Sequence, residues 1–286
     1  MEKRMFNKGR NFFYAFWLKS FFFSFFLLSS FFLSFSYSLA NFTSLYEFDE
    51  APFIPYGTPL LEEDFFYGMT FDGGREGLGA IFALEKNGSS FTILHEFFGG
   101  VSDGSKPKGS LIYSEGVFYG MTSEGGVNNA GTIFKIEKDG SDFTLLHSFS
   151  SASDGGNPQG SLVLEGDTLF GLASEGGVNN AGTIFKIQID GTGFEVFHNF
   201  DPSVDGGAPL NSLILDDSIL YGTTSNGGLT MGTIFKIQTD GTGFEVLHSF
   251  HCGTEGCFPQ GALVFDNDIL YGMTSVAGAY GGGRYF

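Results

Sequence analysis

The chain contains an internal repeat of about 51 residues, and this repeat limits the folds that the chain can adopt. The segment SEGGVNNAGTIFKI occurs at residues 123–136 and again, unchanged, at residues 174–187. Looser copies begin at residues 71, 225 and 275, and an aromatic residue followed by glycine precedes every copy. Repeats of this length, built from short apolar runs, predict the blades of a β-propeller.

Each repeat is predicted to form four short β-strands, called A to D here. Within residues 160–200 the four runs are SLVLEGD, TLFGLAS, GTIFKIQ and GFEVFHNF. Ile184 and Phe185 point to opposite faces of the third strand and both are apolar, so both faces of the sheet must be covered. Four-stranded blades that stack around an axis meet this requirement. The predicted fold class is therefore all-β, and the predicted architecture is a β-propeller.

The number of blades follows from counting complete sets of strands. Four sets are complete, at residues 57–97, 109–149, 160–200 and 211–250. A fifth set begins at residue 261 and supplies strands A, B and the start of C. Residues 42–48 align with the strand D sequence at residues 143–149. We therefore predict five four-stranded blades that are closed by pairing of the N-terminal and C-terminal strands, which removes two open sheet edges.

The first 40 residues are typical of a secretory signal peptide. A Lys/Arg-rich start precedes an uncharged Phe/Leu/Ser run at residues 20–39, and Ser38-Leu39-Ala40 matches a cleavage site. The prediction is a secreted, extracytoplasmic protein with one propeller domain at residues 41–286. The alternative is an uncleaved anchor, because about 20 apolar residues can span a bilayer.

The charge of the chain excludes one class of partner. Cleavage removes five of the 14 basic residues and one of the 32 acidic residues, so the formal charge becomes −22. Nucleic-acid binding proteins need a basic face to attract phosphates, so nucleic acid is not an expected partner.

The long polar loops are predicted to share one end of the blades. The A–B and C–D connections are tight turns such as Asp139-Gly140 and Asp190-Gly191, whereas the B–C and D–A connections are longer. Since strand direction alternates, both long loops lie at the same end, which is where binding residues are expected. The ligand-binding candidates on these loops are Arg75, Glu76, Asn128, Asn129, Asn179, Asn180, Leu229, Thr230, Asp103, Asp154 and Asp205.

Each of these candidates also has a structural interpretation. Asn in the B–C loops suits left-handed turns, and Asp before Gly in the D–A loops is turn chemistry. Calcium is a minor alternative, because it needs about six to eight oxygen ligands and each loop has one carboxylate. No metal or other cofactor is predicted. His95, His147, His198 and His248 recur in strand D, with Tyr46 at the matching place, and are interpreted as hydrogen-bonded packing residues.

Cys252 and Cys257 are the two cysteines of the chain. In an oxidising compartment they are expected to form a disulfide. Two thiols make a poor zinc site, because structural zinc takes about four ligands.

The motifs LYGTTSNGG and GTIFKIQTDGTGFEVLHSF, together with DGG-x-P-x-GSL, resemble the GloVer (Gloeo/Verruco) tandem repeat of choice-of-anchor proteins. That family consists of exported bacterial proteins, so the resemblance implies a propeller outside the cytoplasm. It implies no catalytic residues. The order of strands is also similar to that of kelch propellers, without their Trp.

The function expected from the sequence is noncatalytic binding of an extracellular glycan or protein through the long loops. One alternative is a purely structural surface protein. Another is a propeller glycoside hydrolase, which uses a pair of carboxylates. The nonrepeating acids Glu62, Glu63 and Asp64 fall at a tight A–B turn, away from the long loops. The membrane is an expected partner only through residues 20–39.

Overall fold

The computed structural model describes residues 43–47, 54–228, 231–252, 255–276 and 282–286. The chain divides into two units, residues 1–43 and residues 44–286, and every described strand belongs to the second unit. The predicted signal peptide lies outside the described residues. Among the residues that are described, no helix is long and apolar enough to cross a membrane.

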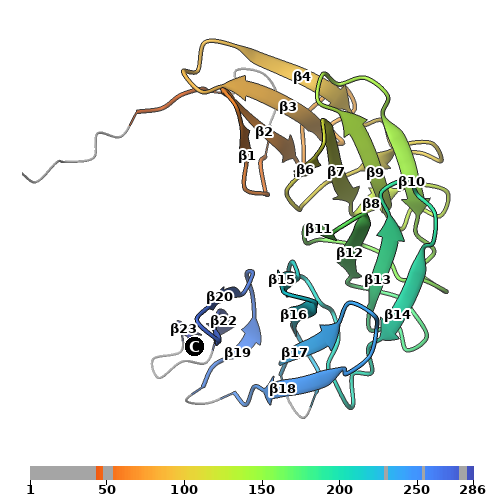
Figure 1. Cartoon of the computed structure of the whole chain (residues 1–286), viewed down its shortest axis with the longest axis vertical. Coiled ribbons are helices and arrows are strands. Elements are labelled where there is room, and N and C mark those ends of the chain that lie inside the picture. The colour runs from red at the N-terminus through yellow and green to blue at the C-terminus, as the bar shows by residue number, and fades with distance from the viewer. Residues whose placement is uncertain (1–42, 48–53, 229–230, 253–254, 277–281) are drawn as a thin grey trace, which may run out of the picture. The chain divides into compact units, whose positions relative to one another are not determined.

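Four antiparallel sheets of four strands each follow one another along the chain (Figure 1). The first contains β1 (Leu60–Glu62), β2 (Phe65–Thr70), β3 (Ala80–Glu85) and β4 (Phe91–Glu96). The second contains β6 (Ile112–Ser114), β7 (Val117–Thr122), β9 (Thr132–Glu137) and β10 (Thr144–Ser148). The third contains β11 (Val163–Glu165), β12 (Thr168–Ala173), β13 (Thr183–Gln188) and β14 (Glu195–Asn199). The fourth contains β15 (Ile214–Asp216), β16 (Ile219–Thr224), β17 (Thr233–Gln238) and β18 (Glu245–Ser249). The prediction of four strands per complete repeat is confirmed.

The last repeat forms the first three strands of the same pattern. These strands are β20 (Val264–Asp266), then β21 (Ile269–Tyr271) with β22 (Met273–Val276), then β23 (Gly282–Tyr285). β19 (Cys257–Pro259) pairs with β22, and the short strands β5 (Gly104–Ser105) and β8 (Glu124–Gly125) pair with each other in the loops. Mutual backbone hydrogen bonds between Gly272 and Phe286 continue the ladder between the second and third strands.

The aromatic-Gly pair of each repeat has a packing explanation. Gly120 lies opposite Phe134 in the β7–β9 ladder. A Cβ atom on Gly120 would lie 2.5 Å from Cζ of Phe134, so a side chain at this position would displace the ring. A Cβ atom on Gly171 would lie 2.4 Å from Cζ of Phe185, and one on Gly222 would lie 2.5 Å from Cζ of Phe235. Glycine in the second strand is therefore required by the ring that crosses it from the third strand.

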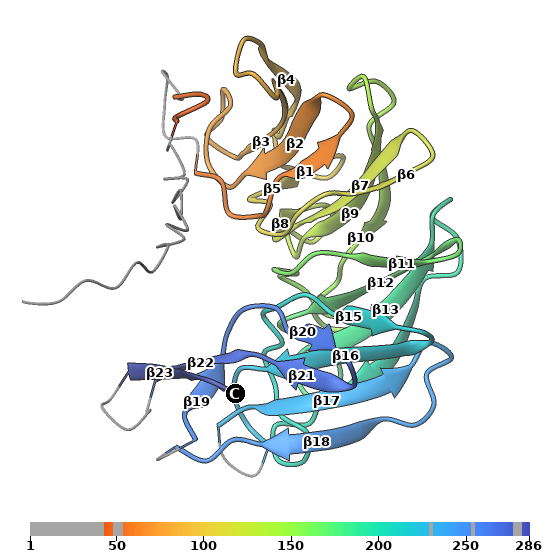
Figure 2. The ribbon, with the colours of Figure 1, turned by 60° about the vertical axis from the view of Figure 1, so that its left-hand side comes forward.

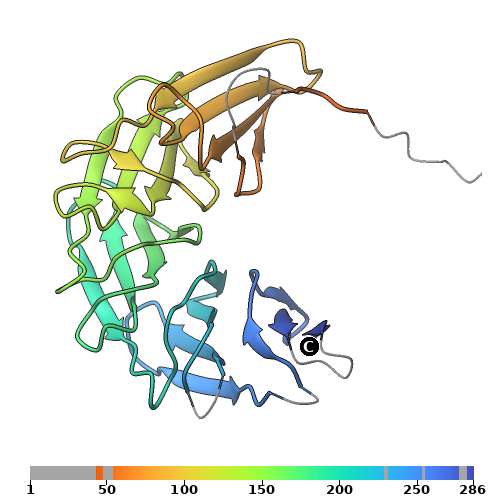
Figure 3. The same ribbon diagram turned by 180° about the vertical axis from the view of Figure 1, so that it is seen from behind.

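Neighbouring sheets pack face to face, as the prediction of two buried faces required (Figures 2 and 3). Met121 and Ile133 of the second sheet share a core with Leu162 and Phe185 of the third sheet. Leu172 and Ile184 on the other side of the third sheet share a core with Phe235 of the fourth. Each sheet therefore depends on its neighbours for burial, as in other repeat proteins.

A series of hydrogen bonds links the segments that immediately precede the first strands of successive sheets. The N–H of Thr58 donates to Oγ of Ser110 at 2.8 Å, the N–H of Ser110 donates to Ser161, and that of Ser161 donates to Ser212. Ala262 has no hydroxyl to continue this series. The N–H of Gly261 instead donates to Oδ1 of Asn211 at 2.9 Å.

The predicted closure of the sheets is not formed in this structure. Described residues 43–47 form no strand, and the described partner of β23 is β22 alone. Residues 44–47 instead lie against the first sheet, where the ring of Tyr46 stacks on that of Phe91 with centroids 4.7 Å apart. The expected strand thus contacts the first repeat without joining the ladder of the last one. Phe42 and Phe48 lie outside the described residues.

Candidate binding face at the long loops

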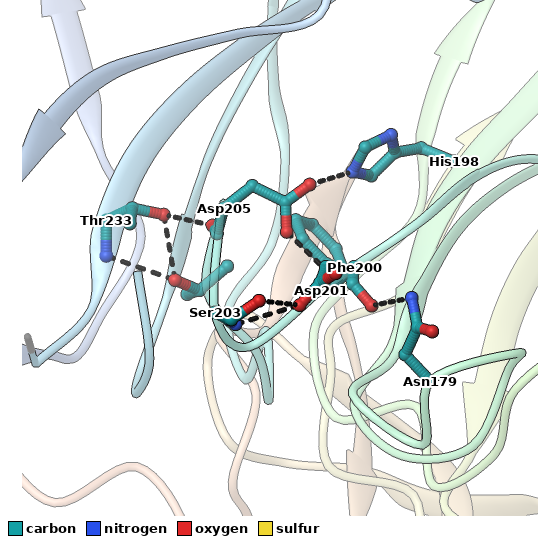
Figure 4. A network of polar contacts seen from close by, with 8 residues as sticks. Asn179, His198, Phe200, Asp201, Ser203, Asp205 and Thr233 are labelled. Carbon is teal, nitrogen blue, oxygen red and sulfur yellow. Dashed lines mark hydrogen bonds and ion pairs between the residues drawn. The ribbon is translucent and has the colours of Figure 1, made fainter. Parts of the chain in front are cut away.

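A His–Asp pair closes each of the first three D–A loops onto the strand that precedes it. Nε2 of His147 lies 2.7 Å from Oδ2 of Asp154, and Nε2 of His198 lies 2.8 Å from Oδ2 of Asp205 (Figure 4). The first repeat has the same pair, His95 and Asp103, at 3.2 Å. These imidazoles are hydrogen-bonded and stacked on phenylalanines, as the sequence predicted.

The second oxygen of each carboxylate holds the loop backbone. Oδ1 of Asp205 accepts a hydrogen bond from the N–H of Asp201 at 2.6 Å, and Oδ1 of Asp154 accepts one from the N–H of Ser150. Asp205 is 6% exposed. Asp103, Asp154 and Asp205, predicted as ligand-binding residues, therefore have their oxygens engaged within the protein. No group of three or more acidic, His or Cys residues that could hold a metal occurs in the described parts of the chain.

Asp201 adds a local cap to the same loop (Figure 4). Its Oδ1 accepts hydrogen bonds from the N–H and the hydroxyl of Ser203 at 2.9 and 2.6 Å. These bonds lower the pKa of the Asp201 carboxyl, with the hydroxyl as the larger cause. Contacts within the protein therefore fix the conformation of this loop.

The paired asparagines of the B–C loops shape those loops. Nδ2 of Asn128 donates to the carbonyl of Phe149 at 3.1 Å, and Nδ2 of Asn179 donates to the carbonyl of Phe200 at 3.0 Å. Asn129 and Asn180 have positive φ values of 52° and 53°, the left-handed conformation that Asn tolerates. All four asparagines are exposed. These asparagines therefore fix the loop conformation, and their side chains remain accessible to solvent.

The remaining predicted residues lie on the first and fourth repeats. Arg75 is exposed and its Nε lies 3.3 Å from Oε2 of Glu96, while Glu76 is exposed beside it. Leu229 and Thr230 lie outside the described residues. The predicted set is thus distributed over separate repeats rather than gathered at one place.

The structure shows a polar pocket of about 280 Å³ between the loops of the second and third repeats. It is lined by Lys108, Ser123, Glu124, Asn129, Ala130, Ser151, Asn157 and Glu175. Of the predicted residues, Asn129 alone lies here. Nδ2 of Asn157 donates to Oε1 of Glu175 at 2.8 Å, which joins the D–A loop to the next B–C loop. Lys108 contributes a positive charge to a lining that also contains the carboxylates of Glu124 and Glu175.

Sequence reasoning missed Lys108, Asn157 and Glu175, and a signal was present for Asn157 alone. The residue before the loop proline differs in every copy, as Lys106, Asn157, Ala208 and Phe258, and has a positive φ each time. Its backbone N–H donates to the preceding repeat in each copy. The side chain at this position therefore varies between repeats while the backbone conformation and its hydrogen bond stay the same.

The candidate carboxylates for hydrolysis lie at a tight turn and are used in ion pairs. Nζ of Lys138 lies 2.7 Å from Oε2 of Glu63 and 3.9 Å from Oε1 of Glu62. The hydrogen bond from Lys138 lowers the pKa of Glu63, and the same bond raises the pKa of Lys138. These contacts link the first and second sheets.

The predicted disulfide is present. Cys252 is bonded to Cys257, with their Cα atoms 5.1 Å apart. Glu255, inside this loop, lies 3.4 Å from Nε2 of His248, so the fourth repeat replaces the His–Asp pair with His–Glu.

Comparisons with known proteins agree with this architecture. A chain from the crystal structure of a nidogen/laminin complex has a TM-score of 0.50 and 14% identity, over 73% of this chain and 67% of that chain. A putative TolB from Agrobacterium tumefaciens has a TM-score of 0.41 and 13% identity, over 65% of this chain and 61% of that chain. The first likeness supports a propeller-like fold and nothing further. No curated protein matched.

The repeat itself identifies the family. The Gloeobacter/Verrucomicrobia repeat matches residues 31–231, which cover the exact duplication, the copy before it and the start of the copy after it. The chain therefore belongs to the Gloeobacter/Verrucomicrobia repeat family.

Proposed function

We propose that this protein is a secreted, noncatalytic binding protein that takes an extracellular glycan or protein at its long loops. The observation that carries the proposal is the pocket between Lys108, Glu124, Asn157 and Glu175. Its cation, carboxylates and amide can all hydrogen-bond with hydroxyl or amide groups of a ligand. Loops of successive repeats form this pocket, with Lys108 and Asn157 from two D–A loops and Glu124 and Glu175 from two B–C loops. These differing side chains give one place on the repeated scaffold its own chemistry.

The proposal includes five blades closed by residues 42–48. The three strands of the last repeat support it, because one strand would complete a four-stranded sheet. Secretion is supported by the disulfide and by the exported-protein repeat that the sequence resembles.

Arrays of glycans and peptides probed with the purified protein, with and without calcium, test the function. We expect binding that Lys108→Ala and Glu175→Gln both weaken about tenfold or more, since each removes a charged contact. Lys86→Ala, which removes an exposed lysine on the first sheet, is the matched control. Binding that survives both pocket variants would place the ligand elsewhere, and binding to nothing would favour the purely structural alternative.

Glycoside hydrolysis is the second candidate, because Glu124 and Glu175 line one pocket and hydrolysis uses two carboxylates. Any glycan bound on the array should be incubated with the protein and its reducing ends measured. Release of sugar that Glu124→Gln abolishes would favour an enzyme over the binding protein.

A further inference from the structure

The first repeat carries a pocket of its own at β4, the edge strand of the first sheet (Figure 1). The pocket has a volume of about 490 Å³ and is lined by Arg75, Ile93, Leu94, His95, Glu96 and Phe98. Arg75 comes from the B–C loop, Phe98 from the D–A loop, and the other lining residues from β4 itself. We call it the β4 pocket, and it shares no lining residue with the pocket at Lys108 and Glu175. Its volume is within the range of small-molecule sites.

The side chains of the β4 pocket differ from those at the same places in the other repeats. Arg75 directly follows the Gly-Gly pair of the B–C loop, and Glu96 and Phe98 follow the strand D histidine, His95, at fixed offsets. The equivalents in the next three repeats are Val127, Val178 and Leu229 for Arg75, Ser148, Asn199 and Ser249 for Glu96, and Ser150, Asp201 and His251 for Phe98. Among the complete repeats, the first alone therefore combines an arginine, a glutamate and an aromatic ring here.

An ion pair forms the polar side of the β4 pocket. Nε of Arg75 lies 3.3 Å from Oε2 of Glu96, and the two side chains are 78% and 20% exposed. A guanidinium carries several N–H donors in a planar fork, so a side chain this exposed keeps donors that a ligand can reach. The carboxylate of Glu96 supplies acceptors. Donors and acceptors therefore lie side by side, and the formal charges of the pair cancel.

Phe98 forms the apolar side of the β4 pocket. It is 52% exposed, but its backbone is fixed, because its N–H donates to Oδ2 of Asp103 at 2.7 Å. The other oxygen of Asp103 lies 3.2 Å from Nε2 of His95, whose ring stacks on that of Phe143 with centroids 3.8 Å apart. A wall that is already fixed loses little freedom when a ligand binds, which favours affinity. The exposed ring of Phe98 is therefore a ready contact surface.

We propose that the β4 pocket binds a neutral sugar ring, with the C–H face of the sugar on Phe98 and its hydroxyl groups on Arg75 and Glu96. A hydroxyl group both donates and accepts hydrogen bonds, so neighbouring hydroxyls match the donors of Arg75 and the acceptors of Glu96 together. The face of an aromatic ring carries partial negative charge and attracts the polarised C–H groups of a sugar. The pair also disfavours ionic ligands, because an anion meets the carboxylate of Glu96 and a cation meets the guanidinium of Arg75.

This inference goes beyond the proposed function, because it assigns a second site on the first repeat and a ligand class for that site. Binding at the β4 pocket needs neither Lys108 nor Glu175, which line the other pocket. Different variants therefore test the two sites, and either site can fail without the other.

Titration of the full chain with methyl glycosides tests the β4 pocket. The probes are the methyl glycosides of glucose, galactose, mannose and N-acetylglucosamine, added to about 50 mM because one sugar ring in an open pocket is expected to bind with a millimolar Kd. The chain has four arginines, so the Nε–H signal of Arg75 in the NMR spectrum of arginine-labelled protein is assigned by comparison with Arg75→Lys. We expect at least one glycoside to shift this signal with a saturable dependence on concentration.

Variants then locate the sugar, with Kd measured from the NMR signals of the glycoside. We expect Phe98→Ala to raise Kd about fivefold, because the aromatic contact is lost, and Arg75→Ala to raise it about tenfold, because charged hydrogen bonds are lost. Phe98→Tyr keeps the ring and should stay within about twofold. Val127→Ala, at the place of Arg75 in the second repeat, is the matched control and should leave Kd unchanged. Phe98 and Arg75 are exposed, so their alanine variants should keep the melting temperature within about 2 °C.

Three results would overturn the proposal. The first is an Arg75 signal that no neutral glycoside shifts, and the second is a Kd for Phe98→Ala equal to that of the unaltered chain. The third is a shift with the methyl glycoside of glucuronic acid, an anion, and none with the neutral probes, because the ligand would then be a carboxylate. Lys108→Ala and Glu175→Gln should leave the glycoside Kd within about twofold, so this experiment and the array experiment on the proposed function have separate outcomes.

Discussion

The imidazole ring of His147 and the phenyl ring of Phe194 are parallel to within 5°, with centroids 3.6 Å apart. The two residues belong to successive repeats, so this contact joins β10 to the residue that immediately precedes β14. The same imidazole also binds Asp154. In the first three repeats, one histidine therefore connects the packing between sheets to the conformation of the loop at the candidate binding face.

Removing the ring of Phe194 should destabilise the protein. We expect Phe194→Ala to lower the free energy of unfolding by about 3 kcal/mol, the lower end for a buried aromatic ring, because Phe194 is half-buried. Urea unfolding followed by circular dichroism measures the change. Phe98→Ala removes a ring that is 52% exposed and should cost clearly less. Equal losses for the two variants would contradict a special role of the stack.

Asp205 should be needed for the loop that it closes. Asp205→Ala leaves the N–H of Asp201 and Nε2 of His198 without their acceptor, and we expect a loss of about 2 to 3 kcal/mol in unfolding free energy. Asp205→Asn keeps the shape and one acceptor, so its loss should be smaller. Asp201→Ala, which removes an exposed cap, serves as the control. Equal unfolding free energies for Asp205→Ala and Asp205→Asn would show that the hydrogen bonds accepted by the carboxylate oxygens do not stabilise the loop.

Gly182 should tolerate no side chain. Its φ is +99°, and a Cβ atom would lie 2.5 Å from the carbonyl oxygen of Ala173 and 2.7 Å from Cδ of Pro209 in the next repeat. We expect Gly182→Ala to lower the melting temperature by about 10 °C or to prevent folding. Gly166 has a φ of +57° and open space around it, so Gly166→Ala should lower it by only about 3 °C. Scanning calorimetry compares the two, and a larger effect at Gly166 would contradict the packing described.

The C–D turns should contribute stability that disappears in acid. Hydrogen bonds from Thr192 and Thr242, chiefly from their hydroxyls, lower the pKa of Asp190 and Asp240 below the ordinary value of 3.8. A carboxyl whose folded pKa is depressed stabilises the folded state above its unfolded pKa, and this contribution is lost as the pH falls through the folded pKa.

Unfolding by urea at pH 3 and pH 6 checks this dependence. The double variant Asp190→Asn/Asp240→Asn should lose less stability between the two pH values than the unaltered chain. Asp216→Asn/Asp266→Asn is the control, since these two carboxyls lie outside the C–D turns. An unchanged pH dependence in the first double variant would contradict the assignment.

Much of the fold follows from local sequence. The neighbouring apolar residues Ile184 and Phe185 require two covered faces, and the Asp-Gly pairs place the tight turns, so strands and loop ends were predictable. The disulfide between Cys252 and Cys257 was predictable as well, because four intervening residues bring the two thiols into reach. The sequence predicted that residues 42–48 pair with the last repeat, whereas Tyr46 in the described part of this segment stacks on Phe91 of the first repeat. Alignment with a fourth strand does not determine which neighbouring sheet the segment packs against.

The sequence by itself determined the fold class, a series of similar β-sheets, because the strand pattern recurs with a period of about 51 residues. The tertiary structure decided what the loop residues do. Asp205 was predicted to bind a ligand because it lies in a long loop. In the structure the D–A loop folds back, so its carboxylate contacts His198 and the N–H of Asp201 instead. Lys108 and Glu175 are far apart in sequence and line one pocket only because neighbouring sheets stack. Contacts between repeats depend on how the sheets pack, and that is set by the three-dimensional fit of their side chains rather than by any local pattern.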